Sequence, residues 1–500
     1  MIVDVSGKPI RFKDKAYSRS GASYGRKSLA SWSTSALSAD DDIALNLDTL
    51  RARSRDLYMS TPLATGAIKT IRTNVVGSGL ALNAHIDFNK LGMTQDQAKE
   101  WERNTQREWS LWAESTACDA SRMMNFYQLQ GLVLSSALLS GDCFVALPFI
   151  KRPDNPYSLK VYLIESDRVC NPTNGQYLNY SKDILQGVEL GKYGEPLAYY
   201  IAKYHPNSTF FMKGKTQEWI KVKAFGDKTG RRNILHIMPD FERPAQRRGV
   251  PLLAPVIEAL KQIERFTNAE LTAAVTSGLF TGFVTTQSAD GLASPFDDFA
   301  DEDKDRNEVS MGNGSMVYLQ EGEDVKFGTP GRPNPEFGGF VTAICRQIGA
   351  ALEIPYELLV KNFTASYSAS RASLLEAWKT FRMRRQWLAD SFCQTVYEEW
   401  LTEAVSLGRI EAPGFFDDVS FKKAWSKAEW SGDSQGQLDP LKEANAAVVR
   451  ISNGLSTREK EAAELTGLQF ELIASQLQTE NKALAPFLQQ SISDNEDNND

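Results

Sequence analysis

The sequence predicts an α+β fold, because the spacing of its apolar residues changes period along the 500-residue chain. Residues 337–352 and 370–408 repeat apolar side chains at helical spacing, and a polar loop separates them. Residues 141–239 instead alternate with a period of 2 between turn signals, which is typical of short β-strands. The predicted framework is therefore a β-rich module set within a helical chain.

Both long helices have clear ends. The first has apolar residues at spacings of 4, 3, 4 and 4, namely Phe337, Val341, Ile344, Ile348 and Leu352. Pro355 ends it, because the residue before a proline is disfavoured in a helix. The second begins at Ser370 and continues to the stop signal at Gly408. Its apolar stripe comprises Leu374, Trp378, Phe381, Leu388, Phe392 and Val396.

The β-rich module consists of short apolar runs between Asn-, Gly- and Pro-containing turns. The runs are DCFVALPFI, LKVYLIES, YLNY, GVEL, LAYYIAKY and NILHIMP. Asp142, Glu165 and Asp167 are candidates for an acid pair, but no histidine, metal cluster or nucleophile accompanies them in the pattern. We therefore expect these carboxylates to serve in turns and helix caps.

Composition excludes several classes of protein. A net charge of −7 argues against a free protein that reads DNA grooves, because such a protein normally carries a basic domain. Five scattered cysteines and three histidines give no zinc pattern, so we expect buried free thiols, no metal and no cofactor. No apolar run reaches about 18 residues and no hydrophobic signal core begins the chain, so neither a membrane span nor a leader is predicted.

Several ordered blocks in and around the long helices resemble one known family. IPYELL, NFTASYSASRASLLEAW, RRQW and FCQTVYEEWLTEA are similar to the lambda-type phage portal proteins, which combine a Pro-Tyr-Glu helix end, a Tyr-Ser-x-x-Arg loop and an Arg-rich helix. The resemblance covers roughly residues 46–480 and weakens near 290–308 and in both tails. It implies a portal fold, with helical wing and crown, a β-rich module and long stem helices around a central channel.

The same resemblance implies a function. Portal proteins are not enzymes; they form rings, typically dodecamers, at one vertex of the virion capsid, and DNA is packaged and ejected through the tunnel. The implied partners are other copies of the chain, double-stranded DNA, the large terminase subunit, head–tail connector proteins and the major capsid protein. Assembly would take place in the cytoplasm of the bacterial host, without a membrane.

The resemblance also divides the chain into regions. They are a basic arm (1–45), a wing with the β-rich module (46–249), a first stem helix (250–283), a clip (284–335), a second stem helix (336–354), a tunnel loop (355–369), a long wing and crown helix (370–408), crown helices (409–485) and an acidic tail (486–500) that we expect to be disordered.

The arm contains a run of basic side chains. They are Lys8, Arg11, Lys13, Lys15, Arg19, Arg26 and Lys27, and in that interval only Asp14 opposes them. A solvated, flexible arm is one interpretation. An arm that contacts a neighbouring subunit or the capsid shell is the other, and the sequence leaves both open.

The stem helices should pack closely. Leu260 and Ile263 lie on the apolar face of the first, which also includes Val256, Leu271, Ala274 and Val275. Ile344, Ile348 and Gly349 lie on the second, and we expect the glycine to permit close approach between subunits. On this reading Gly349→Leu would prevent ring formation while the monomer stays folded.

Two further regions carry predicted contacts. The clip begins with acidic residues that could dock the terminase or could be only a surface loop: Asp297, Asp298, Asp301, Glu302 and Asp303. A β-hairpin with its turn at Glu321–Asp324 should follow. The tunnel loop offers DNA short polar groups and one cation, namely Lys361, Asn362, Thr364, Ser366, Tyr367 and Ser368. An ordinary exposed helix connection is the alternative, with Arg371 and Arg382 pairing to an adjacent subunit.

Two other functions compete with a portal. An ATP-driven nucleic-acid translocase needs a phosphate-binding loop, and Gly214-Lys215-Thr216 resembles the end of one. The glycine required five residues earlier is Thr209, and no apolar strand ends just before it. Another kind of capsid or tail protein is the second competitor, and a ring with an axial hole would distinguish it from a portal.

Overall fold

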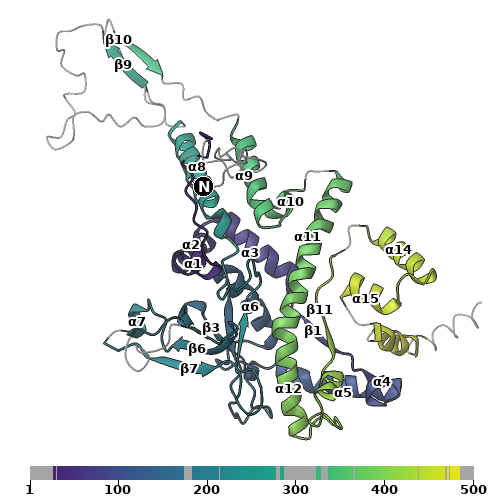
Figure 1. Ribbon diagram of the computed structural model, residues 1–500. Helices are drawn as coiled ribbons and strands as arrows, with labels where there is room; N and C mark the ends of the chain where they lie inside the picture. The colour runs from purple at the N-terminus through teal and green to yellow at the C-terminus, as the bar shows by residue number, and fades with distance from the viewer. Residues whose placement is uncertain are drawn as a thin grey trace, which may run out of the picture.

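The computed structural model describes residues 26–29, 31–173, 183–212, 214–277, 282–286, 323–327, 336–363, 366–436, 439–467, 470–471, 473–482 and 484. These residues form an α+β body, as predicted. Two helices of the predicted stem, α8 (Ile257–Ser277) and α9 (Phe337–Ala351), extend from one end of the body (Figure 1). Two helices near the C-terminus, α14 (Pro440–Ser452) and α15 (Arg458–Thr466), lie to one side of it (Figure 1).

The helices form where the sequence supplies caps and apolar faces. Those before the stem are α1 (Ala39–Ala44), α2 (Leu47–Ser60), α3 (Pro62–Val75), α4 (Phe88–Leu91), α5 (Gln95–Ala113), α6 (Phe126–Ser140) and α7 (Thr209–Met212), with 3-10 turns η2 (Thr116–Cys118), η3 (Ser166–Arg168) and η5 (Ala254–Val256). Those after α9 are α10 (Tyr356–Leu359), α11 (Tyr367–Leu388), α12 (Gln394–Ser406) and α13 (Val419–Trp425). Both α5 and α6 begin with a capping box, at Thr94 and Asn125.

The strands form small antiparallel sheets. The first is β3 (Tyr162–Ile164), β2 (Cys143–Ala146) and β8 (Ile234–Ile237), in that order. The second is β4 (Ile184–Leu185), β5 (Val188–Leu190), β6 (Pro196–Ala202) and β7 (Trp219–Lys223). Five of the six predicted runs contain strands, while YLNY lies outside the described residues; β7 was not predicted, nor was β11 (Ala428–Ser431), which pairs with β1 (Ala81–Ala84).

One large aromatic core joins the helices of the body. Trp109 lies 5.1 Å from both Phe126 and Trp400, edge to face in each case, and all three rings are buried. Trp112 is buried in the same core. Of the cysteines, all but the half-buried Cys170 are buried, and all five are free.

The predicted helix at 370–408 differs in two ways from the structure. Helix α11 begins three residues earlier than expected, at Tyr367, because the Ser366 hydroxyl caps it by accepting from the backbone N–H of Ala369. A π-helical turn, η7 (Ala389–Cys393), then separates α11 from α12. The long element is therefore three segments on one continuous path (Figure 1).

A buried ion cluster joins α2, β2 and the segment that precedes α8. Asp142, just before β2, accepts from Nη2 of Arg51 on α2 at 2.8 Å and from Nε of Arg248 at 2.7 Å. The ring of His236 on β8 lies 3.3 Å from the same carboxylate, and the Gly249 N–H donates to it at 3.1 Å. The expectation that Asp142 serves in a turn or helix cap is therefore wrong. Its carboxylate is the counter-charge for two buried guanidinium groups that would otherwise be unpaired.

The cluster shifts the acidity of its members. Burial alone would raise the pKa of Asp142, but Arg248 and Arg51 outweigh it and hold that pKa well below its usual range. Burial, together with the neighbouring Arg248, lowers the pKa of Arg51 to about 10. Asp142 and Arg51 therefore both keep their charges at neutral pH.

Gly349 serves the fold of a single chain. A Cβ atom at this position would lie 2.5 Å from the backbone oxygen of Ile354, and the Ile354 N–H donates to the Gly349 carbonyl at 2.9 Å. The close approach is to the chain's own turn after α9. The expectation that Gly349→Leu leaves the monomer folded is therefore wrong. We expect this substitution to destabilise the single chain.

We predict that Gly349→Ala lowers the free energy of unfolding by about 2 kcal/mol, because the new methyl group must displace the turn at Ile354. The matched control is Gly338→Ala in the same helix, where a Cβ meets no atom within 4 Å. Thermal unfolding of both variants is the measurement. A Gly349→Ala midpoint equal to that of the wild type would contradict this account.

We predict that Asp142→Asn destabilises the chain by about 3–5 kcal/mol at neutral pH, because two guanidinium groups lose their buried counter-charge. The pKa of Asp142 is lower in the folded than in the unfolded chain, so its contribution is fully present above the unfolded value of about 3.9. It is lost only as pH falls through the lower folded pKa. Denaturant unfolding of wild type and variant should therefore give a constant difference from pH 8 down to about pH 5, and a difference that already shrinks across that range would refute the assignment.

Candidate DNA channel and subunit interface

The stem helices α8 and α9 are buried where they leave the body. Leu260, Ile263 and Ile348 are almost fully inaccessible, and Ile344 packs against the same core. Gly349 is buried with them. The predicted stem residues thus pack within one chain, which anchors both helices rigidly to the body.

The outer halves of the two helices are different. The side chains of Leu271 and Val275 on α8 are 65% and 62% exposed, and that of Phe340 on α9 is 49% exposed. Phe266 holds the helices together, with its ring 4.9 Å from Phe340. The predicted apolar face of the first helix is therefore covered at one end and open at the other.

The first stem helix is shorter than the predicted 250–283. It begins at Ile257 after the 3-10 turn η5 and ends at Ser277, and β9 (Gly282–Thr286) follows. Strand β9 pairs antiparallel with β10 (Glu323–Phe327). The predicted hairpin turn at Glu321–Asp324 is therefore wrong in position, since residue 323 already pairs with Thr286; the acidic residues Asp297, Asp298, Asp301, Glu302 and Asp303 lie outside the described residues.

The predicted tunnel loop at 355–369 contains the short helix α10. Because α11 already begins at Tyr367, the connection between helices is shorter than predicted. Lys361 and Asn362 follow α10 and are exposed, as is Ser366, whose hydroxyl caps α11. Ser368 is exposed in the first turn of α11, where Tyr367 also lies. Thr364 is outside the described residues. The structure therefore brings most of these residues together at the junction of α10 and α11.

Lys361 has an unusual backbone. Its φ of 54° lies in the left-handed region, which the Cβ atom of any residue other than glycine disfavours. The N–H of Asn362 donates to the Glu357 carbonyl at 3.0 Å, which ties the residues after α10 back onto that helix. The tight turn thus fixes the backbone from which the lysine side chain extends.

The arginines of α11 mostly hold the fold. Arg384 is buried and pairs with Asp240 at 3.3 Å, while Arg385 donates to the carbonyls of Val75, Asn74 and Asp433. Arg371 and Arg382 pair within the same chain. Their partners are on the C-terminal helices, so the expectation that Arg371 and Arg382 pair with an adjacent subunit is wrong.

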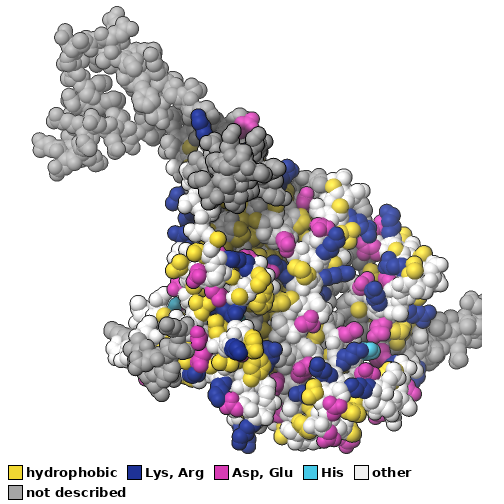
Figure 2. Space-filling view, in the orientation of Figure 1, with side chains coloured by type: hydrophobic (Ala, Val, Ile, Leu, Met, Phe, Trp, Pro, Cys, Tyr) yellow, Lys and Arg dark blue, Asp and Glu magenta, His cyan; other side chains and the backbone are white. Residues whose placement is uncertain are grey.

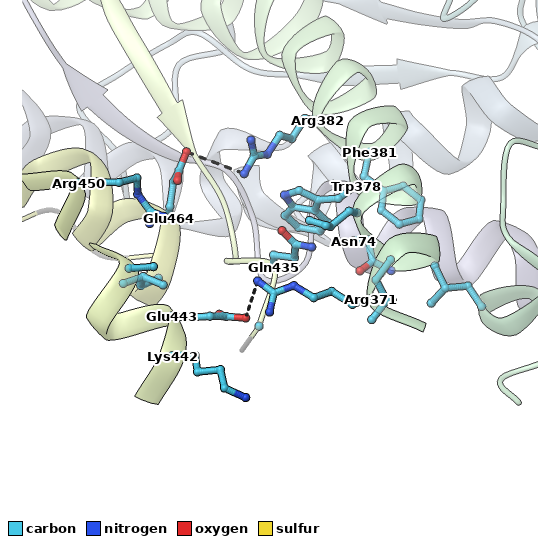
Figure 3. A pocket seen from close by; sticks show the side chains of 16 residues that line it. Asn74, Arg371, Trp378, Phe381, Arg382, Gln435, Lys442, Glu443, Arg450 and Glu464 are labelled. Atoms are coloured by element: carbon cyan, nitrogen blue, oxygen red, sulfur yellow. Dashed lines mark ion pairs between the residues drawn. The ribbon is translucent and has the colours of Figure 1, made fainter. Parts of the chain in front are cut away.

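Those contacts cross a cavity of about 360 Å³ between α11 and the α14–α15 pair (Figure 3). Arg371 lies 3.7 Å from Glu443 of α14, and Arg382 lies 3.9 Å from Glu464 of α15. Trp378 and Phe381 stand on the α11 side (Figure 3). Ion pairs across this cavity therefore help to hold the C-terminal helices to the body. Each pair is partly exposed to solvent, so its contribution to stability is small.

Charge is interspersed over the visible face of the body (Figure 2). Lysine and arginine side chains alternate there with aspartate and glutamate. Among the described residues, one group has metal-ligand geometry: Glu165, Asp167 and His205. Arg55 forms ion pairs with both carboxylates, so its guanidinium already supplies the cation. Within the same residues, no helix is long and apolar enough to cross a membrane.

Sequence reasoning missed the partners in the ion cluster. Arg51 and Asp142 are 91 positions apart and Arg248 is 106 positions from Asp142, so no local pattern connects them. The available signals were the Arg247-Arg248-Gly249 run and the isolated acid before a strand.

Residues 25–385 match the family described as phage portal protein, lambda family. Portal protein B of Escherichia phage lambda is 25% identical over 483 residues, which cover 92% of this chain and 88% of that protein. The portal protein of Escherichia phage N15 is 24% identical over 497 residues, covering 95% and 92%.

Among solved structures, the chain is similar to one from the neck of a native gene transfer agent particle computed with C12 symmetry, with a TM-score of 0.43, 15% identity and coverage of 84% and 92%. A second, from the neck of an empty particle computed with C6 symmetry, has a TM-score of 0.45, 14% identity and the same coverage. The family match spans more than half of the chain, and the chain therefore belongs to the lambda family of phage portal proteins.

Proposed function

We propose that copies of this chain form a ring at one vertex of a phage capsid and that double-stranded DNA enters and leaves through its axis. The observation that carries the proposal is the open apolar face of the stem. Leu271, Val275 and Phe340 are exposed on two helices that extend from the body, and water disfavours such a surface. Side-by-side contact with the stems of adjacent copies would bury it.

Head-to-tail contacts of this kind close into a ring when the rotation between copies is right. A dodecamer is the proposed closed form, by analogy with the family. The role of the ring is structural rather than catalytic. It acts in the virion, after assembly in the bacterial cytoplasm.

The junction of α10 and α11 is the proposed lining of the channel. Lys361 is exposed and oriented by its left-handed backbone, with the hydroxyls of Ser366 and Ser368 close by in sequence. Repeated around a ring, this lysine would form a belt of positive charge toward the DNA phosphates. One cation per subunit attracts the duplex without holding it at one position.

The proposed partners follow from the regions of the chain. The clip would dock the large terminase subunit and then the head–tail connector proteins, with the carboxylates of Asp297, Asp298, Asp301, Glu302 and Asp303 against a basic surface. The wing would face the major capsid protein.

We predict that Leu271→Glu prevents ring formation without unfolding the monomer. The substituted side chain is exposed in the single chain, so stability should change by about 0.5 kcal/mol or less, whereas a carboxylate in an apolar contact is costly. The matched control is Leu111→Glu on α5, which is also exposed. Negative-stain images and thermal unfolding are the measurements, and normal rings from Leu271→Glu would rule out this stem contact.

We predict that Lys361→Glu leaves ring formation unchanged and shortens the packaged DNA or weakens its retention, because a belt of negative charge repels the duplex. Lys379→Glu is the control, since Lys379 is an exposed lysine of α11 that pairs with Glu376. The length of DNA in purified particles is the measurement. Particles of Lys361→Glu that package and retain a full genome would show that this lysine does not face DNA.

A further inference from the structure

A groove of about 770 Å³ lies between α5, the loop after α12 and α13. The rings of Trp101 and Trp425 meet there with centroids 4.9 Å apart. The Trp101 indole N–H donates to the Glu411 carbonyl at 2.7 Å, which fixes the ring. The groove therefore offers a rigid aromatic wall, and neither the stem contact nor the channel uses it.

The groove is acidic. Four charged side chains line it, and Arg409 is already bound to Glu108 by two hydrogen bonds of 2.9 Å. Glu100 and Glu411 are exposed, and neither carboxylate forms an ion pair within the part of the chain that the structure describes. The lining thus has two uncompensated negative charges.

Apolar side chains are also exposed on the segments that adjoin the groove lining in sequence. They are Leu407, Phe416 and Val419. Together these features fit a peptide that is basic and aromatic.

This chain contains such a peptide outside the described residues. Residues 8–19 read KPIRFKDKAYSR, in which five basic side chains accompany Ile10, Phe12 and Tyr17, and Asp14 is the only acid. Its charge is opposite to that of the groove, and its aromatic rings suit the tryptophan wall. The family match begins at residue 25, after this segment.

We propose that residues 8–19 of one copy bind in this groove of an adjacent copy. Helix α1, the first of the described chain, lies across the body from α4 and α5, which favours a contact between copies (Figure 1). Six residues separate Arg19 from position 26 and span up to about 25 Å when extended, which limits how far the neighbour's groove can lie from the first described residue. The inference rests on the proposed ring, and it assigns the basic arm a role in clamping successive subunits.

The test places p-benzoylphenylalanine, a photoreactive phenylalanine analogue, at Phe12 of the full chain. Isotope-labelled and unlabelled chains are mixed one to one, assembled and irradiated, and cross-linked peptides are identified by mass spectrometry. The expected products join position 12 to Met93, Trp101 or Phe421, and half of them carry one labelled and one unlabelled partner. Cross-links only within one chain, only to other surfaces, or none at all would overturn the proposal.

Charge variants provide a second test of the proposal. Glu100→Lys combined with Glu411→Lys should lower the groove cross-link about fivefold or more, because attraction becomes repulsion. Glu114→Lys, at the exposed C-terminal end of the same helix, should leave the yield unchanged. Equal yields from both variants would contradict the electrostatic basis. Negative stain of the same samples separates the two proposals, since rings without groove cross-links would remove only this inference.

Discussion

The carboxylate of Asp142 is the point on which the arrangement of wing and stem depends. Arg51 reaches it from α2 and Arg248 from the segment before the stem, and both guanidinium groups are buried. Their remaining N–H groups donate to carbonyls, including those of Ser140 and Ser166. Because a buried charge without these partners costs several kcal/mol, only one placement of α2, β2 and the base of α8 satisfies all of them.

The path from the stem to the proposed channel lining is similarly constrained. Glu353 and Lys361 both have left-handed φ angles, 57° and 54°, and they flank the short helix α10. Gly349 allows the turn before α10 to pack against α9. Since each of these positions allows little freedom, a change in the tilt of the stem would be transmitted to the residues after α10. The proposed stem contact and the proposed channel lining are thus connected through a constrained turn.

Local patterns in the sequence predicted the helices well and the long-range contacts poorly. The spacing from Phe337 to Leu352 predicted α9, because an amphipathic helix records its own buried face, although the helix ends at Ala351 and not at the expected residue 354. Pairing of β1 with β11 was missed, because both strands have four residues and lie more than 300 positions apart. Gly349 was placed on the right face, but the sequence could not show that its own chain supplies the close neighbour. The basic arm and the groove proposed to bind it are likewise far apart in sequence, so no local pattern connects them.

The central claim is that the open face of the stem is covered by other copies of this chain. Negative-stain imaging of the purified wild-type protein, with its mass measured by light scattering, tests this most directly. The account predicts rings with an axial hole and a mass that is an integral multiple of the 55.7 kDa chain. A stable monomer at all concentrations, or closed shells without an axial hole, would contradict it.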